Sequence, residues 1–169
     1  MSHMLRLAEA QEPFFETITL GGFYQLFLRR FSGPHQSNRE ETSEYRLWNE
    51  YLPITAASLR FLHADCLAEH GTIDTRIGLI MEEQDFLDFN FRESDRTQYI
   101  PGGRFLHTFI RGNALALHHR AWLEPALAYL RTHQLQLSGD AFTRMFFVGD
   151  DNGVETRYDE LWMPINGEP

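Results

Sequence analysis

The sequence is poor in cysteine and in basic residues, and it contains no long apolar run. Cys66 is the only cysteine among the 169 residues, so no disulfide can form within the chain. A single cysteine is typical of a reducing compartment, and we expect a cytoplasmic location. The 15 basic residues are outnumbered by 24 acidic ones, which gives a net charge of −9. A nucleic-acid binder needs a basic face, and a membrane span needs about 18 consecutive apolar residues. We therefore expect that the protein binds neither nucleic acid nor a membrane.

Motifs of common enzyme and metal sites are also missing. The chain has no Gly-rich phosphate loop and no Gly-x-Ser-x-Gly nucleophile turn. His63, Cys66 and His70 have ligand-type side chains, and His118 and His119 are adjacent. A structural zinc site needs four ligands at a regular spacing, however, and this spacing is loose. We therefore predict neither a metal nor another cofactor.

Aromatic side chains are what the sequence has in abundance. It contains 14 Phe, 6 Tyr and 3 Trp, while 43% of all residues are hydrophobic and 23% are charged. This composition and length are typical of one globular domain. Residues 1–4 resemble the remnant of an expression tag, and no low-complexity linker divides the rest. We expect a single domain over residues 5–169.

The order of predicted elements is strand, helix, strand, strand, and it occurs twice. Gly and Pro residues mark the bends and turns, and apolar spacing separates helices from strands. In the first half we expect a strand over 14–30 bent at Gly21–Gly22, a helix over 40–52 capped by Ser37 or Asn38, and strands over 58–68 and 72–81. In the second half we expect a strand over 97–111, a helix over 114–133 kinked or broken at Pro125, and strands over 141–148 and 154–165 joined by an acidic hairpin turn.

This order predicts an α+β fold with two helices on one side of an antiparallel sheet. The two strand-helix-strand-strand pseudo-repeats would span about residues 12–90 and 95–166. A groove between two such halves is a usual place for a ligand.

Three blocks of the second half carry a family likeness. They are Tyr-Ile-Pro-Gly-Gly-Arg-Phe at 99–105, Trp-Leu at 122–123, and Glu-Leu-Trp-Met-Pro-Ile at 160–165. With them the chain resembles the gyrase-inhibitor-like effector-binding domain, which occurs in many AraC-type transcription regulators and also as a free-standing protein. The likeness implies a cleft for hydrophobic, often cationic, drug-like molecules, with Glu160 as the acidic residue that meets the ligand's charge. A DNA-reading region is not present, so the stand-alone form is implied.

The residues of the predicted strand over 154–165 support a cation site independently of the family likeness. Alternation places Tyr158, Glu160 and Trp162 on one face of the strand. Aromatic faces attract cations, and a partly buried carboxylate adds to this attraction. The alternative is a solvated edge-strand carboxylate, or one that is paired with Arg157 or Arg104.

Further aromatic residues of the predicted helices and of the second bent strand are candidates for the walls of the pocket. Aromatic residues at helical spacing also fit an ordinary core. These candidates are Tyr45, Trp48, Tyr51, Phe105, Phe109, Trp122 and Tyr129.

Three functions follow from these observations. The leading hypothesis is a module that binds hydrophobic organic cations, for sensing or sequestration. The second is a small-molecule hydrolase on the same fold that uses Tyr158 and Glu160. The third is a protein-interaction module whose acidic surface meets a basic partner in a salt-sensitive complex. The sequence does not determine the oligomeric state.

Overall fold

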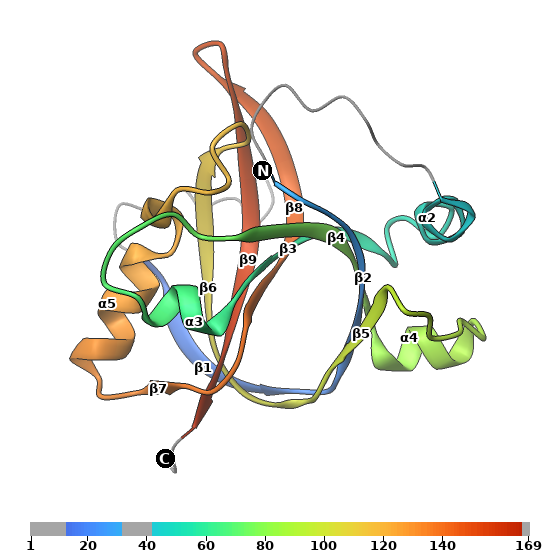
Figure 1. Cartoon of the computed structure of the whole chain (residues 1–169), viewed down its shortest axis with the longest axis horizontal. Coiled ribbons are helices and arrows are strands. Elements are labelled where there is room, and N and C mark those ends of the chain that lie inside the picture. Colours follow the sequence, from blue (N-terminus) through green and yellow to red (C-terminus); the bar gives the residue numbers. More distant parts are fainter. Residues whose placement is uncertain (1–12, 32–41, 167–169) are drawn as a thin grey trace.

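The computed structural model describes residues 13–31 and 42–166 and has an α+β fold dominated by one antiparallel sheet. Viewed in Figure 1, the strands are arranged around a ring and the helices lie outside it. The strands are β1 (Phe15–Leu20), β2 (Phe23–Arg30), β3 (Ala56–Phe61), β4 (Thr75–Glu82), β5 (Thr97–Ile100), β6 (Gly103–Asn113), β7 (Gln136–Leu137), β8 (Ala141–Asp151) and β9 (Val154–Asn166). The helices are α2 (Ser43–Asn49), α3 (His63–Leu67), α4 (Glu83–Asp88), the 3₁₀ turn η1 (Arg120–Trp122) and α5 (Glu124–Thr132).

Two bent segments hold the ends of the sheet together. The strand order is β1-β6-β9-β8-β3-β4-β2-β5, and β7 pairs with β9. β1 continues into β2 through Gly21–Gly22, as the sequence predicts, and β5 continues into β6 through Pro101–Gly102. Since β1 pairs with β6 and β2 pairs with β5, the two bends cross. A Cβ on Gly102 would lie 2.8 Å from the backbone carbon of Gly21, so this crossing requires glycine.

The inner face of the curved sheet is packed with aromatic side chains. Phe23, Phe105, Phe142 and Trp162 form one buried cluster with Ile80. Ring centroids of Phe23, Phe142 and Trp162 are 5.4 to 5.6 Å apart, the range in which aromatic pairs attract. Burial of each such side chain contributes about 1.5–3 kcal/mol, which makes this cluster a main support of the ring.

The outer face of the sheet carries two further cores, each under its own helices. α3, η1 and α5 cover one core, which includes Leu106, Leu127 and Leu161. α2 and α4 cover the other, where Trp48 and Phe86 pack on β2 and β4. Figure 1 shows the two helix groups on different sides of the ring. Within the described residues, no helix has the length and apolar character needed to cross a membrane.

The hairpin predicted between the last two strands is confirmed, but β8 extends to Asp151, so the predicted acidic turn is shorter and its aspartates belong to the strand. Asp151 pairs with Val154, and the two residues between them, Asn152 and Gly153, both have positive φ angles of 55° and 83°. Asn-Gly with two positive φ angles is typical of the type I′ turn, whose twist matches that of the strands.

Several predicted boundaries are wrong, and three predicted elements differ most from the structure. The strand predicted over 58–68 ends at Phe61, and residues 63–67 form α3. The helix predicted over 114–133 begins only at Glu124, because Pro125 lacks an N–H and occupies the first turn of α5. The helix predicted over 40–52 is the shorter α2, and Thr42 caps it by accepting a hydrogen bond from the Tyr45 N–H at 3.1 Å. The caps expected at 37 and 38 lie outside the described residues.

Candidate functional site

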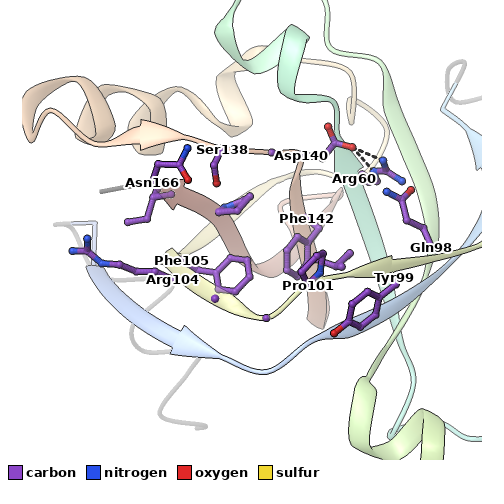
Figure 2. A pocket seen from close by; sticks show the side chains of 16 residues that line it. Arg60, Gln98, Tyr99, Pro101, Arg104, Phe105, Ser138, Asp140, Phe142 and Asn166 are labelled. Carbon is purple, nitrogen blue, oxygen red and sulfur yellow. Dashed lines mark hydrogen bonds and ion pairs between the residues drawn. The ribbon is translucent and has the colours of Figure 1, made fainter. Parts of the chain in front are cut away.

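A pocket of about 460 Å³ opens where β9 ends and β6 and β8 begin. Figure 2 shows Phe105 and Phe142 from these strands, and Pro101 from the β5–β6 bend, among its lining side chains. Polar side chains also line it, and they are Arg60, Gln98, Arg104, Ser138, Asp140 and Asn166. The site therefore combines apolar surface with a few polar groups, as small-molecule sites do.

An ion pair fixes one wall of this pocket. The guanidinium of Arg60 on β3 donates from Nε to Asp140 Oδ2 at 2.6 Å, and its Nη2 contacts the same oxygen (Figure 2). The other carboxylate oxygen of Asp140 accepts the backbone N–H of His63 at 2.7 Å. Both carboxylate oxygens of Asp140 are therefore occupied, which holds the start of β8 against β3.

A second constellation lies further along the inner face, around His107. Its Nδ1 is 2.8 Å from Glu16 Oε1 on β1, and its Nε2 is 3.4 Å from Glu160 Oε1 on β9. Arg144 on β8 contacts the other oxygen of Glu160 from Nε and Nη2, each at 3.0 Å. The Arg144 Nη1 also reaches Glu82 at 3.4 Å. The imidazole of His107 thus lies between two carboxylates, and Arg144 balances the charge of the buried one, Glu160.

Electrostatics in this cluster favour the charged forms. Burial by itself lowers the pKa of His107, but hydrogen bonding and the charges of Glu160 and Glu16 outweigh burial and raise the pKa above its usual value. Burial by itself raises the pKa of Glu160, but His107 and Arg144 outweigh it and leave the pKa below its usual value. The cluster therefore favours the imidazolium form of His107 and the ionised form of Glu160.

Two ring nitrogens in this region are buried without a hydrogen-bond partner. They are Nε2 of His107 and Nε1 of Trp162, and the two rings stack with centroids 5.8 Å apart. The Arg144 guanidinium also lies over the Trp162 ring, 5.3 Å from its centroid. Trp162 Nε1 therefore lacks an acceptor, whereas His107 Nε2 has only the 3.4 Å contact with Glu160 Oε1.

The structure brings some of the residues predicted from the sequence together. Tyr158, Glu160 and Trp162 share the inner face of β9, as alternation predicts. Phe109 lies beside His107, with ring centroids 5.2 Å apart, and Phe105 lines the pocket. Glu160 is paired with Arg144, which the sequence did not indicate.

The arginines expected beside Glu160 lie elsewhere. Arg157 binds the buried Asp159 instead, with Nε 2.6 Å from Oδ1. Arg104 is in the lining of the pocket. The predicted alternative partners of Glu160 are therefore wrong, while the pairing of this carboxylate with an arginine is confirmed.

The helical aromatic residues lie apart from both constellations. Trp48 and Tyr45 pack in the core under α2, and Tyr51 contacts Phe89 and Phe91. Trp122 and Tyr129 belong to the core beneath α5, on the outer face of the sheet. None of them lines the pocket, because each helix buries its apolar face against the outside of the sheet.

Sequence reasoning missed several residues of these sites. His107, Glu16 and Arg144 come from three strands whose register is not encoded locally, and Arg60 and Asp140 meet only through the pairing of β3 with β8. One signal was present: alternation along β6 places His107 on the same face as Phe105 and Phe109.

Metal and thiol chemistry find no support in the part of the chain that the structure describes. No group of three or more His, Cys, Asp or Glu residues within it is arranged to hold a metal ion. His63 Nε2 lies 3.0 Å from the carbonyl oxygen of Leu137. Burial raises the pKa of the Cys66 thiol to about 12, which keeps it protonated and a poor nucleophile.

Comparison with known proteins shows the fold only. No family model and no curated protein matches this sequence. Two solved structures are similar, both described as hydrolases from Listeria innocua. One has a TM-score of 0.50 and 10% sequence identity, covering 90% of this chain and 91% of that chain. The other has a TM-score of 0.50 and 12% identity, covering 94% of each chain. The chain therefore has the same overall fold as these two structures.

Proposed function

We propose that this protein is a binding module for small, largely hydrophobic organic molecules, which it holds in the pocket of Figure 2. The observation that carries the proposal is the pocket itself. Its volume of about 460 Å³ falls within the roughly 300–1,000 Å³ of known small-molecule sites. Phe105 and Phe142 supply rigid apolar surface, and the Arg60–Asp140 pair supplies fixed polar groups.

The strand order supports two pseudo-equivalent halves with the ligand near their junction. β2, α2, β3 and β4 follow one another as β6, α5, β8 and β9 do, and their pairing orders β2-β4-β3 and β6-β9-β8 match. The two triplets meet through β3 and β8. Arg60 comes from the first half and Phe142 from the second, and both line the pocket.

A cationic ligand held by Glu160 stays a prediction. Glu160 is not among the residues that line the pocket, and its carboxylate already contacts Arg144 and His107. A cation at Glu160 would have to compete with the Arg144 guanidinium, and this competition lowers its affinity.

Thermal unfolding in the presence of uncharged aromatic compounds tests the proposal, because a ligand that binds only the folded state raises the melting temperature. Ser138→Trp places a large ring at the exposed edge of the pocket and should abolish the shift. Leu115→Trp, at an exposed position that does not line the pocket, is the matched control and should keep the shift. Equal shifts in both variants would contradict binding at this site.

A second function, a small-molecule hydrolase, is favoured by the arrangement around His107. His107 lies between two carboxylates that favour its protonated form, and a protonated imidazole can act as a general acid. The two similar structures are described as hydrolases, which agrees with this candidate.

A screen of small esters and amides with product detection tests this second function. We expect hydrolysis by the wild type to fall at least about 100-fold in His107→Gln, as is typical when a general acid is lost. His133→Gln, at an exposed position on the end of α5, is the control. Undiminished hydrolysis in His107→Gln, or intact substrates with the wild type, would contradict the hydrolase.

A further inference from the structure

The pocket has a smaller neighbour that shares part of its wall. This second pocket, of about 140 Å³, lies over the inner surface of β2 and β4 and against β5. Arg60 and Gln98 line both pockets, so the two pockets lie next to each other. The lining of the smaller pocket comprises Gln25, Phe27, Arg60, Arg76, Ile77, Gly78, Asp95, Arg96, Thr97 and Gln98.

Positive charge predominates in the smaller pocket. Its lining contains Arg60, Arg76 and Arg96, against a single carboxylate, that of Asp95. Asp140 balances Arg60 from the larger pocket. Asp95 is exposed to solvent, so screening weakens its effect on the arginines. Arg60 is therefore balanced by Asp140, whereas Arg76 has no ion-pair partner in the part of the chain that the structure describes.

Arg76 is the group that most lacks a partner. Its Nε is buried and makes no hydrogen bond, and the guanidinium lies over Phe27 at 5.7 Å from the ring centroid. Within the described part of the chain, Arg76 forms no ion pair. A buried donor on a charged group without an acceptor is costly, and a bound anion would remove that cost.

The geometry points to an anion subsite: we propose that the Arg76 guanidinium, beside Arg60, binds the carboxylate of a hydrophobic organic acid whose apolar body occupies the larger pocket. A guanidinium matches a carboxylate because its parallel N–H groups meet two oxygens. The small volume suits a head group, and Phe105, Phe142 and Pro101 suit a flat apolar body. This inference rests on the proposed function, because the body of the ligand must occupy the same pocket.

Three matched probes test the sign of the preferred charge. 1-Naphthylacetate is an anion, 1-naphthylacetamide is its neutral analogue, and 1-naphthylmethylamine is a cation of similar size. We expect calorimetry on the wild-type chain to show that the acid binds about tenfold more tightly than the amide and that the amine binds most weakly. A tenfold difference in affinity is what one charge-assisted hydrogen bond contributes.

Arg76→Gln separates the subsite from the rest of the pocket. It should bring the affinity for the acid down to that for the amide, while the affinity for the amide stays within about twofold, which also shows that the variant is folded. Arg131→Gln, an exposed arginine on α5, is the charge-matched control and should keep the preference for the acid.

The outcomes are distinct. If the amide binds as tightly as the acid, if the amine is preferred, or if Arg76→Gln keeps the full preference, the anion subsite is overturned while the binding module stands. If none of the three compounds binds, both the subsite and the proposed function are overturned.

Discussion

Replacing Asp159 by asparagine should destabilise the protein strongly, because this carboxylate joins three strands from a fully buried position. Asp159 on β9 is 0% exposed, and Arg157 binds it through Nε and Nη2 at 2.6 and 2.7 Å. Thr143 on β8 donates its hydroxyl to the same carboxylate and accepts the backbone N–H of Leu59 on β3 at 3.0 Å. Asp159→Asn keeps the shape of the side chain but leaves the buried Arg157 charge without a counter-ion.

The magnitude follows from that uncompensated charge. Breaking a buried ion pair by removing one partner costs about 3–5 kcal/mol. At about 2–4 °C per kcal/mol for a chain of this size, the melting temperature should fall by about 10 °C. Urea unfolding followed by tryptophan fluorescence gives the free energy of unfolding by linear extrapolation.

A matched substitution at the surface provides the control. Asp151 pairs with Arg111 at 3.0 Å, and both side chains are 46% exposed. Asp151→Asn should therefore cost less than about 1 kcal/mol. If Asp159→Asn costs no more than Asp151→Asn, the reasoning from burial is refuted.

Three further predictions concern pH and backbone geometry. The folded state raises the pKa of His107, so protonation of His107 stabilises the fold fully below the ordinary pKa of about 6.5, and this stabilisation is lost as pH rises through the folded-state pKa. His107→Gln should flatten this pH dependence of the free energy of unfolding, measured with urea from pH 6 to 9. An unchanged pH dependence in the variant would contradict the role of His107. A Cβ on Gly112 would lie 2.5 Å from the Trp122 ring, so Gly112→Ala should cost about 1–3 kcal/mol in the same assay. Gly21→Ala, whose Cβ meets nothing within 4 Å, is its control, and equal losses would refute the steric argument. Gly153→Ala should cost about 1–2 kcal/mol in thermal unfolding, because φ is +83° there, and full stability would show that the turn adopts another conformation.

The parts of the fold that the sequence predicted depend on local chemistry. The Asn-Gly hairpin turn is encoded by residues that permit positive φ angles. At the Gly21–Gly22 bend, a Cβ on Gly22 would lie 2.6 Å from the side chains of Glu83 and Tyr99. Helix α3 was missed because distant contacts hold it. The Arg120 guanidinium donates to the carbonyl oxygens of Asp65 and Cys66, at 2.7 and 2.9 Å, and so satisfies the end of a five-residue helix. No pattern within 58–68 could show this.

The candidate site was predicted in part for a similar reason. Alternation correctly placed Glu160 and Trp162 on one face, since side chains alternate along any strand. The partner of Glu160 depends on the register between β8 and β9, which contains a shift between Met145 and Phe147. Aromatic spacing on a helix shows which face is buried but not what covers it. The helical tyrosines and tryptophans were therefore assigned to a ligand pocket, although they pack against the outside of the sheet.

The crossing of the two bent segments has a consequence for how the chain folds. β1 begins the chain's first half but pairs with β6, and β5 pairs back with β2. Each half therefore contributes an edge strand that pairs with the other half, and Phe15 pairs with Thr108, far along the chain. Such distant pairings make loop closure the slow step, so the two halves should appear together in a single cooperative refolding phase on the millisecond-to-second scale of high-contact-order proteins. Neither half, expressed alone, has the strand that closes its own edge.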